Sequence, residues 1–223
     1  MSFYDVLLEQ TRSEREQLQR VPVIQNALAG NIDLATYIAF LSQAYQHVRH
    51  TVPLLIACRD HLPHHLDWLK PALSEYVLEE QGHDQWILDD IQASGGDAQA
   101  VRSARPGDDV EVMLAYAYDT IARGNPLGFM GMVHVLEGTS VALALRAADA
   151  IQHALGLPDQ AFTYLRSHGL LDQEHTDHFA ELVNKIDVLD DQRAIVHGAR
   201  QFYRLYANVF RSLSHTGCRE PVL

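Results

Sequence analysis

The stretch that decides the fold runs from Leu165 to Leu189 and opens with LRSHGLLDQEHTDHF, residues 165–179. Residues taken from it at alternating steps of three and four share one face of a helix, the pattern of a helix packed against its neighbours. The members of that face are Leu165, His168, Asp172, His175, Phe179, Leu182, Ile186 and Leu189. Three side chains that commonly bind metal ions thus stand where Leu or Val would be expected.

Two interpretations compete for this face. A core histidine hydrogen-bonded to a core aspartate would explain a single His–Asp pair. A buried carboxylate without such a partner costs roughly several kcal/mol unless it binds a metal. Because His168, Asp172 and His175 lie in one register, we favour a metal site. His178 falls off the face, beside Glu174 and Glu181, and we expect it to be solvated.

Composition limits the class of protein. The 223 residues are 47% hydrophobic, enough for one large core. The net charge of −12 argues against a nucleic-acid partner, which needs a basic surface. We expect no membrane span and no signal peptide at the acidic, amphipathic start. Two cysteines, Cys58 and Cys218, form neither a disulfide framework nor a zinc motif, so the expected location is cytoplasmic.

The periodicity along the rest of the chain predicts an all-α fold, since strand patterns are nearly absent. Proline, glycine and capping residues divide the helical segments. Pro53 should kink the second long helix, residues 95–108 should form a loop, and Asp159 should cap the helix that contains His168. We expect a single bundle of about seven main helices over residues 1–213, with a tail at 214–223. The expected helices cover residues 2–18, 24–28, 33–62, 64–91, 110–124, 127–148, 165–189 and 191–213.

A second carboxylate–histidine pair lies on the helix expected over residues 64–91. Glu80 and His83 continue an apolar face that includes Leu73 and Tyr76. Their spacing matches that of Asp172 and His175, which favours a shared metal site. Glu79 has the i,i+4 spacing to His83 that would also allow it to bind, but we expect a surface carboxylate.

A lone glutamate lies in the most apolar segment, residues 127–148, where Glu137 follows Leu136. A buried ion pair with Arg or a hydrogen bond to Tyr would each satisfy its carboxylate, but two other carboxylate–histidine faces make metal binding the better explanation. His134 could bind the metal or orient a ligand. His47 and His50 lie beside their helix face, and we expect them to be solvated or to orient a ligand.

Together the metal-type residues are Glu80, His83, Glu137, His168, Asp172 and His175. Carboxylates and imidazoles in a helical bundle suit iron or manganese. Six ligands are too many for one ion with open positions and suit two ions. The ferritin-like pattern needs two D/E-x-x-H pairs and two lone Glu residues. This chain departs from that pattern, because His168 stands in place of the second lone Glu.

At these residues the chain resembles the haem-oxygenase-like di-iron oxidases, close to the TenA/PqqC superfamily. The resemblance rests on Glu80 with His83, on Glu137, and on the H-x-x-x-D-x-x-H motif of His168, Asp172 and His175. It implies a haem-oxygenase-like bundle, two Fe(II) ions and O2 as co-substrate. Two residues separate Glu80 from His83, and this spacing is similar to that in the fatty-acid decarboxylases of that family.

Other branches of the superfamily fit less well. No histidine precedes His47, whereas haem oxygenases take their proximal histidine from the first helix. TenA-type thiaminases need a nucleophilic cysteine, and neither Cys58 nor Cys218 is placed as one. We therefore expect an iron-dependent oxidase or oxygenase acting on a small fatty-acid-, amino-acid- or amine-like metabolite, with a homodimer as a possible assembly. The alternative is a metal-free TenA/PqqC-like ligand-binding or regulatory protein.

Overall fold

The computed structural model describes residues 1–213, apart from the side chains of Gln173 and Glu174. This part of the chain is all-helical and contains no strand. It has more helices than the expected seven or so. The α-helices are α1 (Phe3–Gln10), α2 (Arg12–Gln19), α3 (Pro22–Leu28), α4 (Leu34–Val48), α5 (Thr51–His61), α6 (Lys70–Glu79), α7 (His83–Ala93), α8 (Ala98–Ser103), α9 (Asp108–Arg123), α10 (Met130–Leu155), α11 (Thr163–Val183) and α12 (Leu189–Leu213). The 3-10 helices are η1 (His64–Leu69), η2 (Pro126–Phe129) and η3 (Asp159–Ala161).

The count is higher because three segments expected to be continuous are divided. The first breaks at Thr11, whose hydroxyl donates to the carbonyl of Leu7 at 2.7 Å. The second breaks after Arg49, which lies four residues before Pro53. A proline ring clashes with the carbonyl of the residue four positions earlier, so the helix cannot continue regularly through Arg49. The third breaks at Glu80–Gly82, where Gly82 has φ +88°. Such a left-handed conformation suits glycine, which has no Cβ to clash.

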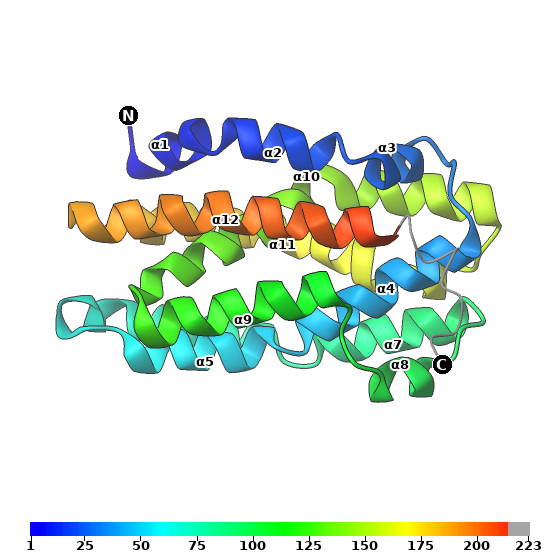
Figure 1. Cartoon of the computed structure of the whole chain (residues 1–223), viewed down its shortest axis with the longest axis horizontal. Coiled ribbons are helices and arrows are strands. Elements are labelled where there is room, and N and C mark those ends of the chain that lie inside the picture. Colours follow the sequence, from blue (N-terminus) through cyan, green and yellow to red (C-terminus); the bar gives the residue numbers. More distant parts are fainter. Residues whose placement is uncertain (214–223) are drawn as a thin grey trace.

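The longest helices form the frame of the bundle. Figure 1 shows α12 running lengthwise, with α1 to α3 along one side and α5 and α9 along the other. The 26-residue α10 packs against both α11 and α12. Of the face predicted for residues 165–189, the side chains from Leu165 to Ile186 are buried or partly buried in the described structure, whereas Leu189 is exposed and begins α12.

Two local predictions in this region were wrong. The expected loop at residues 95–108 contains α8, whose N-cap Asp97 accepts from the amide of Ala100. Asp159 does not cap α11, because its carboxylate accepts from Gln152 and Arg166. Asp90 of α7 caps α11 instead and accepts from the amides of the first two residues of that helix, at 3.0 and 2.8 Å. This contact joins two helices that carry candidate ligands.

One segment, Pro126–Leu155, is long and apolar enough to cross a membrane by length and composition. No such apolar run was expected from the sequence. In the structure 61% of its most apolar window is buried inside the bundle. That burial is typical of the core helix of a globular domain, which meets the same criteria.

Candidate metal centre

The first part of the candidate centre lies at the junction between α6 and α7. Glu80 follows the end of α6, His83 begins α7, and Gly82 turns the chain between them. Across this turn Glu80 Oε2 lies 3.1 Å from His83 Nδ1, and both side chains are largely buried. Burial alone would raise the pKa of Glu80, but the hydrogen bond to His83 and the charges of nearby histidines lower it overall. The carboxylate is therefore held in its ionised, metal-binding form.

The second part comes from α11 and meets the first. The ring of His168 lies 4.8 Å from that of His83, edge to face. Ligand atoms of Glu80, His83 and His168 all fall within 4.8 Å of one another. Nδ1 of His168 lies 3.1 Å from the carbonyl oxygen of Tyr164, to which it must donate its hydrogen. The other ring nitrogen, Nε2, is then left as the acceptor, the arrangement common in metal-binding histidines.

Asp172 and His175 extend the α11 side of the centre. The side chain of Asp172 is 3% exposed, and its Oδ1 lies 3.5 Å from His175 Nδ1. The Nε2 of His175 lies 3.4 Å from Glu79 Oε2, so Glu79 contacts the group although its side chain is 52% exposed. Asp172, despite opposing burial, raises the pKa of His175. His175 is thus held between two carboxylates.

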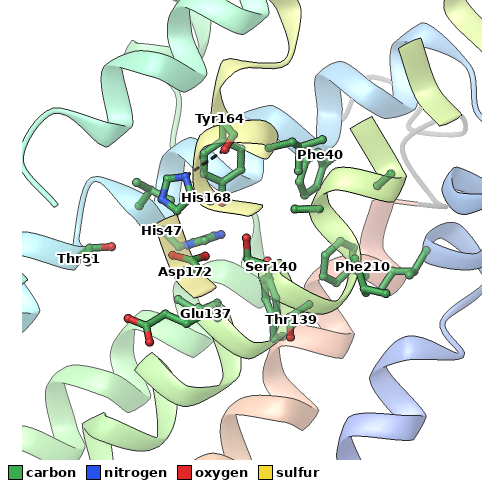
Figure 2. Close-up of a pocket in the computed structure, with 18 of the residues that line it drawn as sticks. Phe40, His47, Thr51, Glu137, Thr139, Ser140, Tyr164, His168, Asp172 and Phe210 are labelled. Atoms are coloured by element: carbon green, nitrogen blue, oxygen red, sulfur yellow. Dashed lines mark hydrogen bonds between the residues drawn. The ribbon is translucent and has the colours of Figure 1, made fainter. Parts of the chain in front are cut away.

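Glu137 of α10 provides the third part. Glu80, Glu137, His168 and Asp172 all line one internal cavity. In Figure 2 Glu137 lies on one side of Asp172 and His168 on the other. Glu137 is 8% exposed, and among the described residues its Oε2 has no hydrogen-bond partner, whether Arg or Tyr. Burial, followed by the charges of Asp172 and Glu80, raises the pKa of Glu137 well above its ordinary value. A cation would satisfy this carboxylate.

His134, one helical turn before Glu137, points elsewhere. It lies among aromatic rings: stacked on Phe179 at 5.8 Å and edge-on to Tyr4 and Tyr203. It does not line the cavity that holds Glu137. Burial lowers the pKa of His134 to about 4, so it is a neutral core residue.

His47 was expected to be either solvated or placed to orient a ligand, and the structure excludes the first of these alternatives. His47 is 3% exposed and lines the same cavity as Glu137 and His168. Its Nδ1 is buried, with no hydrogen-bond partner in the part of the chain that the structure describes. Such an atom costs about 1–3 kcal/mol when unsatisfied. Burial lowers the pKa of His47 to about 3. By contrast, His50 is partly exposed and its Nδ1 lies 2.9 Å from the Tyr118 hydroxyl.

Two other residues that were not expected to bind metal, His178 and Cys58, can be placed. His178 was expected to be solvated, but it is only partly exposed and its ring lies 6.0 Å from that of Tyr76. The side chain of Glu174 lies outside the described residues. Cys58 is fully buried, donates to the Pro126 carbonyl at 3.4 Å and does not line the cavity. Burial raises its pKa to about 12, so it is not an activated nucleophile.

The residues present fit an iron centre. The donors are carboxylates and imidazoles, which suit iron, and Glu137 presents an unpaired buried oxygen. A family model described as iron-containing redox enzyme matches residues 38–207. The chain belongs to this haem-oxygenase-like family. Among curated proteins, none matches the sequence significantly.

Solved structures share the fold of this family member. A domain of unknown function with a haem-oxygenase-like fold from Shewanella denitrificans is 22% identical, with a TM-score of 0.84 over 96% of this chain and 92% of that one. A TenA homologue from Pseudomonas syringae pv. tomato is 10% identical, with a TM-score of 0.78 over 96% and 93%. Haem oxygenase from Leptospira interrogans is 15% identical, with a TM-score of 0.72 over 95% and 100%. At these identities the likeness establishes the fold alone.

Proposed function

We propose that this protein is a cytoplasmic non-haem iron oxidase or oxygenase that uses O2 to oxidise a small metabolite. The observation that carries the proposal is the unpaired, buried Oε2 of Glu137, a residue that shares one cavity with Glu80, His168 and Asp172. Three carboxyl groups enclosed in one cavity disfavour one another's ionised forms, and a bound cation would let all three ionise. The proposed ligands of two Fe(II) ions are Glu80, His83, Glu137, His168, Asp172 and His175.

When bound, the iron would supply the redox chemistry with O2. The chain itself would do the rest. The contact between His168 and the Tyr164 carbonyl fixes the ring tautomer, so that Nε2 is the binding atom. The hydrogen bond between Glu80 and His83 sets these two side chains in place before any metal arrives. The mainly apolar cavity wall keeps bulk water away from the reacting groups.

Iron content measured after anaerobic Fe(II) loading tests the proposal. We expect about two equivalents per chain in the wild type, from the six ligands available. A Glu137→Gln variant keeps the size of the side chain but removes its charge, and should lose iron. The matched control is Glu111→Gln, on the exposed face of α9, which should load normally. Failure of the wild-type protein to bind iron would instead support a metal-free, TenA-like ligand-binding protein.

A further inference from the structure

The cavity extends beyond the candidate ligands into an apolar arm. It has a volume of about 150 Å³, in the range of apolar cavities that hold a benzene ring. Figure 2 places Phe40 and Phe210 on the opposite side of His168 and Asp172 from Thr51. The two phenyl rings are stacked, with centroids 5.9 Å apart. Small side chains on α3 and α10, including Ala147, leave the space open.

Charge divides this cavity into two parts. Its ionisable lining side chains, among the described residues, are three carboxylates and the imidazoles of His47 and His168, together with the phenols of three tyrosines. Lys and Arg do not line it. A charged group placed in the apolar arm would lose its hydration without gaining a partner. The arm therefore suits an uncharged body and confines the polar groups of a bound molecule to the end near His168.

His47 stands at that polar end with an unused hydrogen-bonding atom. Its ring is held edge-on to Tyr206, with centroids 5.8 Å apart. Figure 2 shows it next to Asp172 and His168. The ligand set assigned to iron does not include it, and its Nδ1 lacks a partner among the described residues. Buried polar atoms are nearly always paired. The Nε2 of His134 is also unpaired, but of the two histidines only His47 lines the cavity, where a bound molecule can reach its ring.

We propose that His47 determines the substrate specificity of this cavity: its imidazole forms a hydrogen bond with the polar head of a one-headed substrate, whose uncharged apolar body fills the arm beside Phe40 and Phe210. This inference rests on the proposed function for its chemistry but concerns a residue outside the iron ligands. The cavity would select a molecule that is polar at one end only and would exclude one with charges at both ends.

Two matched probes test the proposal on the metal-free protein. The first is 3-phenylpropanamide, with a polar head, and the second is propylbenzene, which has the same body without the head. Dissociation constants would be measured by calorimetry for the wild type and for His47→Phe, which keeps an aromatic ring but removes the polar nitrogen. We expect about three- to tenfold weaker binding of the amide by the variant and a change below twofold for propylbenzene. His47→Asn, which restores a polar atom, should recover the amide binding.

Equal weakening of both probes, or no weakening of the amide, would overturn the assignment. Ala147→Phe fills the arm from α10 and should abolish binding of both probes. If that variant does not fold, Ala27→Phe on α3 repeats the test from another wall. The iron content of the His47 variant shows whether a failure concerns this inference or the proposed iron centre. His47→Phe should load iron like the wild type, and loss of its iron would make His47 a ligand and overturn the proposal.

Discussion

The α6–α7 junction and α11 each present a carboxylate and a histidine three residues apart, but they do so in different ways. On α11, Asp172 and His175 lie on an unbroken helix, where the spacing alone places them on one face. At the junction, Glu80 and His83 face each other across a turn. The irregular pair is the closer one, at 3.1 Å against 3.5 Å. A regular helix therefore places two ligands on one face, whereas the turn brings the carboxylate and the imidazole into direct hydrogen-bonding contact.

The largest effect should come from the regular helix. Asp172→Ala removes a buried carboxylate at the centre of the cluster, and we expect it to abolish iron loading and O2 consumption. The helical fold should persist, because the change also removes a buried charge that needs compensation. Iron analysis, an oxygen electrode and circular dichroism would measure these results. His178→Ala, on the same helix, is the control and should keep both properties. Unchanged O2 uptake in Asp172→Ala would rule out the iron oxidase proposal.

The two regions are joined by Asp90, which allows the second prediction. Burial raises the pKa of Asp90 to about 6, above the ordinary value of 3.8, although the amides of Tyr164 and Thr163 oppose the shift. Since the folded protein holds this proton more tightly than the unfolded chain, the stabilisation is present below pH 4 and is lost as the pH rises through 6. A shift of about two units corresponds to about 3 kcal/mol.

Asp90→Asn keeps an acceptor oxygen for one of the two amides and does not titrate. Urea unfolding at several pH values should show the stability of the wild type falling, relative to this variant, by up to about 3 kcal/mol between pH 4 and 7. Subtracting the variant removes the contributions of the histidines. A difference independent of pH would show that folding does not raise the pKa of Asp90.

Sequence periodicity predicted the all-helical class and the buried face of α11 because both depend on local spacing. It predicted a boundary between helices only where a strong helix-breaking residue such as Pro22 is present. It missed the break before His83, since a single glycine such as Gly82 is tolerated in helices and only its φ of +88° reveals the turn. The shared cap of α11 by Asp90 was missed because it joins residues more than 70 positions apart.

The candidate site shows the same limit. Periodicity chose polar residues on buried faces, so it found Glu137 and Asp172. It could not assign His47, which lies beside its helix face and is buried in a tertiary environment that includes Tyr206 of α12. Nor could it separate His134 from Glu137, because two residues one turn apart on a helix buried nearly all round can face different neighbours. Such assignments require the tertiary packing.

The turn at the junction can be tested directly. Gly82→Ala places a Cβ at a positive φ, which costs about 1–2 kcal/mol, although nothing within 4 Å would meet it. We expect the melting temperature to fall by about 2–8 °C and iron affinity to weaken. Gly138→Ala is the control, since its Cβ also meets nothing within 4 Å, in the interior of α10. It should stabilise the protein by about 0.5–1 kcal/mol. Equal effects of both changes would show that the turn is not required.

The smallest effect should come from the carboxylate that lies between the two regions. Glu79 ends α6 and its Oε2 lies 3.4 Å from His175 Nε2, so it competes for the nitrogen that would otherwise bind metal. Its side chain is 52% exposed, and exposed ion pairs contribute at most about 1 kcal/mol. We expect Glu79→Ala to change stability by less than about 0.5 kcal/mol and to leave the iron content at two equivalents, because His175 keeps Asp172 beside it. Iron analysis alongside Glu80→Ala, which should lose iron, makes the contrast. If Glu79→Ala lost iron and Glu80→Ala kept it, the ligand from the junction would be the exposed glutamate, and the turn at Gly82 would serve to place Glu79 instead of Glu80.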